Sequence, residues 1–128
     1  MNAKVEKLLK NKIWNLGTYG DEPNVVPVLF KEIMDDGRLL VGDVFLKTTL
    51  SNVERNGKIA VSVCDSSSLE GYQIKGRAEY VTDGPMVEKF KTMVETAFKG
   101  AATAKGALVI TPETIIVTTP GPDNKKVL

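Results

Sequence analysis

The residues with the clearest chemical potential lie in the stretch 43–56, which reads DVFLKTTLSNVERN and joins an apolar run to a helical pattern. Lys47, Thr48 and Thr49 stand at the junction, and after the first residue no acidic side chain occurs before Glu54. A helix start exposes unpaired N–H groups and a partial positive charge. With an ammonium and a hydroxyl beside them, these groups could bind an anion such as a phosphate. Taken alone, the residues favour the alternative, a threonine N-cap next to a solvated lysine.

The composition excludes several classes of catalytic site. The chain contains no histidine, which removes Ser-His-Asp and Cys-His systems and imidazole acid–base chemistry. Cys64 is the only cysteine, so neither an intrachain disulfide nor a cysteine-based zinc site can form. We therefore expect no metal and assign no catalytic residue, and we expect the chemistry to come from a bound cofactor.

Length and charge are typical of one globular domain, which we expect to span residues 1–128 with a flexible tail over 120–128. The net charge of +1 provides no broad field for nucleic acid or anionic lipid. The first residues, MNAKVEKLLKNK, are amphipathic, and no apolar run approaches the roughly 18 residues of a membrane span. We therefore expect a cytoplasmic protein without nucleic-acid or membrane partners.

The hydrophobic periodicity predicts a mainly β protein with helices inserted between strands. Few strands are followed by a helix, which excludes a parallel doubly wound sheet and favours a small barrel with mostly sequential antiparallel strands. The predicted helices are 3–12, 48–56 and 85–99, and the predicted strands are 13–20, 24–34, 38–44, 58–64, 72–81, 107–110 and 114–119.

Single residues refine this prediction. Pro27 cannot donate a ladder hydrogen bond, so its strand should lie at an edge or contain a bulge or break. Gly76 interrupts a cleanly alternating strand and indicates a bulge or a sharp bend. The continuous apolar centre of 38–44 predicts a strand that is buried on both faces. Cys64 ends an apolar strand, where we expect an inert packed side chain.

A second set of polar residues lies on one face of the strand 72–81. Gln73, Lys75 and Arg77 alternate with apolar residues there. They could face a ligand or a partner subunit, or they could be the solvated face of an antiparallel sheet, which is the commoner case.

Two stretches, GDVFLKTTLSNVERNGKIAVSV and EGYQIKGRAEYVTDGP followed by an amphipathic helix, resemble the pyridoxamine 5′-phosphate oxidase-like FMN-binding split-barrel family. The resemblance covers roughly residues 10–119. It implies a six- to seven-stranded antiparallel split barrel that forms a homodimer with FMN between the subunits. It also implies that the phosphate lies at Lys47 and Thr48, while the helix start itself offers Thr49 as an alternative hydroxyl. The other implied cofactor-binding residues are Val26, Pro27, Val28 and Leu29 on one strand, Gly42, Asp43 and Val44 on another, Asn52 beside the phosphate loop, and Gln73 near the flavin.

The resemblance predicts an FMN-dependent oxidoreductase. The absence of histidine argues against pyridoxamine 5′-phosphate oxidase activity itself. Two alternatives stay open at this point. One is a carrier or binding module that holds FMN, a deazaflavin or haem for a partner protein. The other is a structural dimer whose barrel has lost its cofactor.

Overall fold

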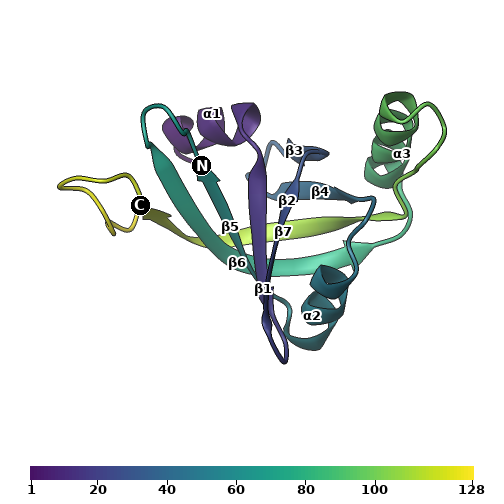
Figure 1. Cartoon of the computed structure of the whole chain (residues 1–128), viewed down its shortest axis with the longest axis horizontal. Helices are drawn as coiled ribbons and strands as arrows, with labels where there is room; N and C mark the ends of the chain where they lie inside the picture. The colour runs from purple at the N-terminus through teal and green to yellow at the C-terminus, as the bar shows by residue number, and fades with distance from the viewer.

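The chain forms three helices and seven strands (Figure 1). The computed structural model describes every residue from Met1 to Leu128. In chain order the elements are α1 (Ala3–Asn11), β1 (Trp14–Tyr19), β2 (Pro23–Val28), β3 (Lys31–Ile33), β4 (Leu39–Asp43), α2 (Thr48–Asn56), β5 (Lys58–Cys64), β6 (Gly71–Val81), α3 (Pro85–Ala97) and β7 (Gly106–Val117).

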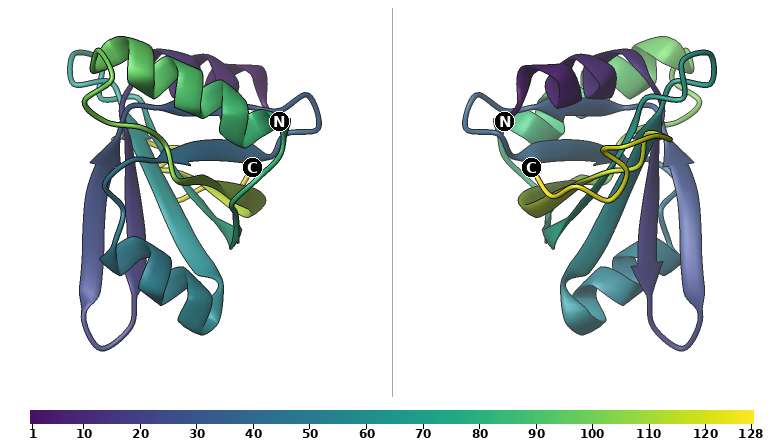
Figure 2. Two further views of the ribbon diagram at one scale, coloured as in Figure 1. Left: turned by 90° about the vertical axis from the view of Figure 1, so that its right-hand side faces the viewer. Right: turned by 90° about the vertical axis from the view of Figure 1, so that its left-hand side faces the viewer.

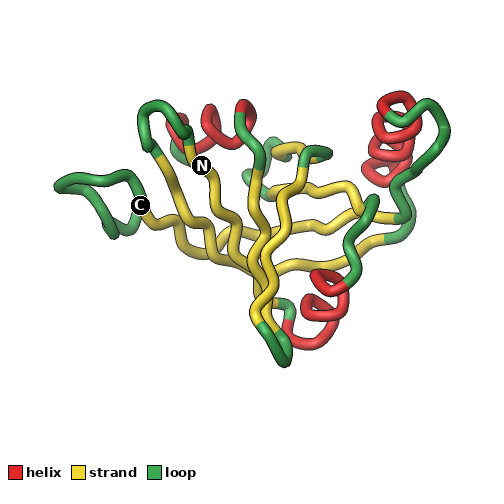
Figure 3. The backbone as a smooth tube through the Cα atoms, viewed as in Figure 1, coloured by secondary structure: helices red, strands yellow, loops and turns green.

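The strands form one antiparallel sheet in the order β2-β1-β5-β6-β7-β4-β3, which curls into a half-barrel (Figures 1 and 2). The three helices lie outside the curled sheet (Figure 3). The left view of Figure 2 shows α3 above and α2 below one open side, with β2 along its margin. The predicted mainly β split barrel is confirmed. None of the helices combines the length and the apolar character needed to cross a membrane.

The two edge strands of the sheet, β2 and β3, are consecutive in the chain and are separated only by Leu29 and Phe30. The prediction of one strand over 24–34 is therefore wrong. β2 pairs with β1 whereas β3 pairs with β4. The local apolar pattern is continuous, but the pairing partner changes after β2. Because so short a link joins both edges, the sheet must curl back on itself. Pro27 lies on an edge strand, as predicted.

Two apolar clusters fill the molecule. The larger one includes Trp14, Leu16 and Ile74 inside the curled sheet, with α1 packed against it. The smaller one packs Val87, Phe90 and Val94 of α3 against the other side of β4 and β7. All five residues of β4 are buried because the strand lies between the two clusters, which confirms the prediction for 38–44.

β6 and β7 pair along their whole length, with a register shift between Lys75 and Gly76. Gly76 faces Pro112, Lys75 faces Thr114, and Glu113 is the extra residue of a bulge. The predicted bulge at Gly76 is confirmed. The prediction of two final strands is wrong, because residues 111–113, which separate the two predicted strands, are accommodated by this bulge within one strand.

The C-terminal tail makes backbone contacts with β7, and Cys64 lies at the surface. Residues 120–128 fold back along β7, where Lys125 N–H donates to the Val117 carbonyl at 2.7 Å and Leu128 N–H donates to the Ile115 carbonyl at 2.9 Å. These bonds give the tail defined contacts with β7, and its expected flexibility stays a prediction. The Cys64 side chain is exposed, so the expected packed position is wrong, because Cys64 falls on the outward-facing side of β5.

Candidate functional site

An apolar cavity of about 420 Å³ lies between β2 and the segment that follows β4. Nine of its eleven lining residues are hydrophobic. Of the twelve predicted cofactor-binding residues, the structure brings six to this cavity: Val26, Pro27, Val28, Leu29, Gly42 and Val44. A volume of this size and an apolar lining are typical of a small-molecule site.

Sequence reasoning missed the remaining lining residues, which are Ile13, Phe30, Phe45, Leu46 and Phe98. Phe98 lies just after α3 and its ring contacts two of the others, with centroids 5.9 Å from Phe30 and 6.2 Å from Phe45. Phe45 and Leu46 directly precede Lys47, so proximity in the chain could have suggested them. No local signal marks Ile13 or Phe98, because only the fold brings them to β2.

The start of α2 lies next to the cavity, since Leu46 lines the cavity and Lys47 is the N-cap of the helix. No side chain caps this helix and no acidic residue occupies its first turn. Lys47 and Thr48 are exposed. The alternative of a threonine N-cap is therefore wrong, because the helix begins one residue earlier than a cap at Thr48 requires. Its first N–H groups remain available to an external acceptor.

Thr49 and Asn52 lie on the buried side of α2, with 1% and 6% of their surfaces exposed. The Asn24 side-chain amide donates to the Thr49 hydroxyl at 3.2 Å. The Asn52 amide donates to the Thr18 hydroxyl at 3.1 Å. These two bonds attach α2 to the hairpin of β1 and β2, whose second strand forms one wall of the cavity.

Asp43 ends β4 with its carboxylate turned into the protein, and only 1% of the residue is exposed. One carboxylate oxygen accepts the Leu46 backbone N–H at 3.1 Å, and the other accepts the Tyr80 hydroxyl at 2.6 Å. Burial raises the pKa of Tyr80, and the hydrogen bond and negative charge of Asp43 raise it further.

Gln73 lies apart from the other predicted residues. It pairs with Ser62 of β5 and Ile116 of β7, on the face of β6 that alternates with the buried residues. It does not line the cavity. The other predicted residues lie in three adjoining places, which are the cavity, the start of α2 and the buried contacts beneath that helix. Gln73 lies outside all three.

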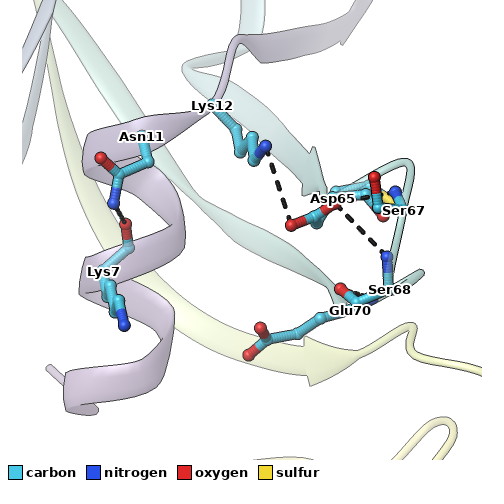
Figure 4. A network of polar contacts seen from close by, with 8 residues as sticks. Lys7, Asn11, Lys12, Asp65, Ser67, Ser68 and Glu70 are labelled. Carbon is cyan, nitrogen blue, oxygen red and sulfur yellow. Dashed lines mark hydrogen bonds and ion pairs between the residues drawn. The ribbon is translucent and has the colours of Figure 1, made fainter.

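A separate polar network joins α1 to the turn between β5 and β6 (Figure 4). Asp65 accepts backbone N–H groups of Ser67 at 2.8 Å and Ser68 at 3.4 Å, and its carboxylate lies 3.7 Å from the Lys12 ammonium. The two backbone hydrogen bonds, followed by the charge of Lys12, lower the pKa of Asp65. None of these residues lines the cavity, and their contacts account for the shape of the turn.

Alkaline pH should destabilise the fold through Tyr72, whose hydroxyl donates to Glu70 at 2.7 Å. Burial, then the hydrogen bond and charge of Glu70, raise the pKa of Tyr72 from 10.0 to about 12. Between these values the unfolded chain releases the phenolic proton while the folded chain keeps it. The contribution is therefore complete below pH 10 and is lost as the pH rises toward 12.

Urea denaturation across this pH range measures the effect. Tyr72→Phe removes the ionisation, so the free energy of unfolding of this variant should fall less steeply than that of the wild type. Equal slopes for the two proteins would contradict the prediction.

The comparison with known families decides the classification. The sequence model of the pyridoxamine 5′-phosphate oxidase family matches residues 1–119. The chain belongs to this family. An uncharacterized protein of Methanocaldococcus jannaschii is 31% identical over the whole chain and 87% of its own length. The two sequences therefore align over the full span of this chain.

Solved structures share the fold of this pyridoxamine 5′-phosphate oxidase family member. HupZ of Group A Streptococcus superimposes with a TM-score of 0.81 and 26% identity, covering 96% of this chain and 98% of its own. An FMN-binding protein of Syntrophomonas wolfei has a TM-score of 0.80 at 16% identity, covering 93% of this chain and 86% of its own. This chain therefore shares the fold of both proteins.

Proposed function

We propose that the protein is an FMN-binding flavoprotein that acts as an oxidoreductase, with FMN at the interface of a homodimer. The observation that carries the proposal is the continuity of an apolar cavity with an uncapped, acid-free helix start beside Lys47. This arrangement occurs in a pyridoxamine 5′-phosphate oxidase family member. The FMN-binding protein of Syntrophomonas wolfei, which has the same fold, adds support.

The two halves of the proposed site fit the two chemical parts of FMN. The apolar cavity walls on β2 and on the segment Gly42–Val44 would bury the flavin ring, while backbone groups supply polar contacts. Lys47, the Thr48 hydroxyl and the first N–H groups of α2 would bind the phosphate. Bound FMN would supply the redox chemistry.

The other predicted residues have distinct proposed roles. Asp43 would contribute through its backbone position, since its carboxylate is engaged by Tyr80 and Leu46. Thr49 and Asn52 would support the phosphate end by holding α2 on the hairpin. Gln73 would approach the flavin from the second subunit.

The homodimer is supported by large apolar side chains that remain exposed around the cavity. Phe45 is 77% exposed and Leu29 is 68% exposed, and Ile13 and Phe98 are exposed beside them. A contiguous exposed apolar surface is typical of a protein interface. We propose that a second copy covers it, in a cytoplasmic protein whose single cysteine is free.

Phe45→Glu should weaken the dimer by about 100-fold, because each subunit would bury one charged group in the interface. Sedimentation equilibrium measures the dissociation constant. Leu69→Glu is the matched control, since Leu69 is 51% exposed but does not line the cavity. A wild-type monomer at micromolar concentration, or equal effects of the two changes, would refute the proposed interface.

Titration of the purified protein with FMN tests the function directly. We expect a perturbed visible flavin spectrum, quenched flavin fluorescence and one FMN per subunit. An unperturbed spectrum would refute the flavoprotein proposal. If FMN binds but neither NADH nor NADPH reduces it in steady state, the result would favour a carrier over an oxidoreductase.

A further inference from the structure

One buried carboxylate, that of Asp43, holds the start of the loop that connects β4 to α2. Asp43 accepts the Leu46 N–H at 3.1 Å and the Tyr80 hydroxyl at 2.6 Å. Its backbone carbonyl accepts the Lys105 N–H at 2.8 Å. Two elements distant in sequence, β6 and the segment before β7, therefore fix the residue at which the loop begins.

The position of the Tyr80 hydroxyl is itself closely fitted. A Cβ atom placed on Gly106 would lie 2.5 Å from the Tyr80 hydroxyl oxygen and 2.6 Å from the Val81 carbonyl oxygen. The absence of a side chain at Gly106 thus allows the ring of Tyr80 to approach Asp43 at the end of β4.

The hydrogen bond to Leu46 has consequences for the next residue. Lys47 is the N-cap of α2, yet no side chain caps this helix. In most helices a capping side chain fixes the first turn. Here the nearest such contact is the Asp43 carboxylate, which fixes the backbone one residue before the N-cap. The direction of Lys47 and the first N–H groups of α2 therefore depends on a pair outside the helix.

We propose that Asp43 and Tyr80 are positioning residues for the phosphate end of the cofactor site, an inference that rests on the proposed FMN function. Neither side chain contacts the ligand. They hold the Leu46 backbone so that Lys47 and the start of α2 meet the phosphate in a fixed arrangement. Removal of the pair should impair binding of a phosphorylated flavin more than binding of the same flavin without phosphate.

Tyr80→Phe tests this, because it removes only the hydroxyl. We expect the dissociation constant for FMN to rise about tenfold while that for riboflavin changes less than about twofold. Tyr19→Phe is the matched control, since Tyr19 is 48% exposed, and it should leave both constants unchanged. Thermal unfolding of each variant without ligand verifies folding.

A second pair of variants separates positioning from general stability. Asp43→Ala should reproduce the selective loss of FMN affinity. Asp43→Asn keeps an oxygen acceptor for Leu46 and an amide that can donate to the Tyr80 oxygen, so it should restore wild-type FMN affinity. Equal losses for FMN and riboflavin, or no loss for either, would overturn the positioning role alone. Failure of the wild type to bind FMN would overturn the proposed function and this inference together.

Discussion

Replacement of Lys47 by alanine should weaken FMN binding by about 10- to 50-fold at low ionic strength. Lys47 precedes a helix start that has no acidic residue in its first turn and no side-chain cap. Its ammonium would supply the only full positive charge at the start of α2, where the phosphate is proposed to bind. Because the side chain is exposed, salt should screen this contribution, and the effect of the substitution should shrink as salt is added.

Fluorescence titration with FMN and riboflavin measures this effect. Riboflavin affinity should be unchanged by Lys47→Ala because riboflavin lacks the phosphate. Lys7→Ala provides the control, since Lys7 is an exposed lysine on α1 outside the cavity. A loss of the same size for riboflavin, or for Lys7→Ala, would show that Lys47 does not bind the phosphate.

Gly76→Ala should lower the free energy of unfolding by about 3 kcal/mol, the largest stability effect that we expect from a single methyl group. A Cβ atom at this position would overlap the Thr111 carbonyl oxygen and lie 3.0 Å from its carbonyl carbon. These are backbone atoms of β7 at the bulge, so the clash can be relieved only by moving a strand.

Gly17→Ala is the matched control for this experiment. Gly17 also lies inside a strand, but an added Cβ would find its nearest neighbours at 3.8 and 4.0 Å, which is ordinary contact. Urea denaturation should show a change of less than about 1 kcal/mol for Gly17→Ala. A Gly76→Ala variant as stable as Gly17→Ala would indicate that the bulge can rearrange without cost.

The parts of the fold that depend on local chemistry were predictable from the sequence. The alternation in 58–64 and 72–81 fixes which side chains face the core, and Gly57, with φ of 70°, ends α2 where a left-handed residue is required. Pairing partners were not predictable. The residues 24–34 form one apolar pattern although they belong to two edge strands of the sheet, and residues 111–113 separate two predicted strands although they lie within one bulged strand.

The same distinction between local and long-range features applies to the candidate site. The acid-free start of α2 was visible in the sequence, because it depends on consecutive residues. The role of the threonines was not, since Thr49 of α2 is buried against Asn24, a residue of β2. Likewise, the contribution of Phe98 to the cavity depends on how α3 packs, and no pattern near residue 98 reports it.

The short link of Leu29 and Phe30 joins the two edges of the sheet and also lines the cavity. Any fluctuation that detaches β2 from β1, or β3 from β4, would therefore also displace one wall of the cavity. A ligand would bind only to the closed form, in which this wall is in place. It would therefore lower the population of open molecules by mass action. Hydrogen exchange of the β2 and β3 amides should then slow as ligand is added. The affinity for flavin would therefore depend on the equilibrium between the open and closed forms of the barrel.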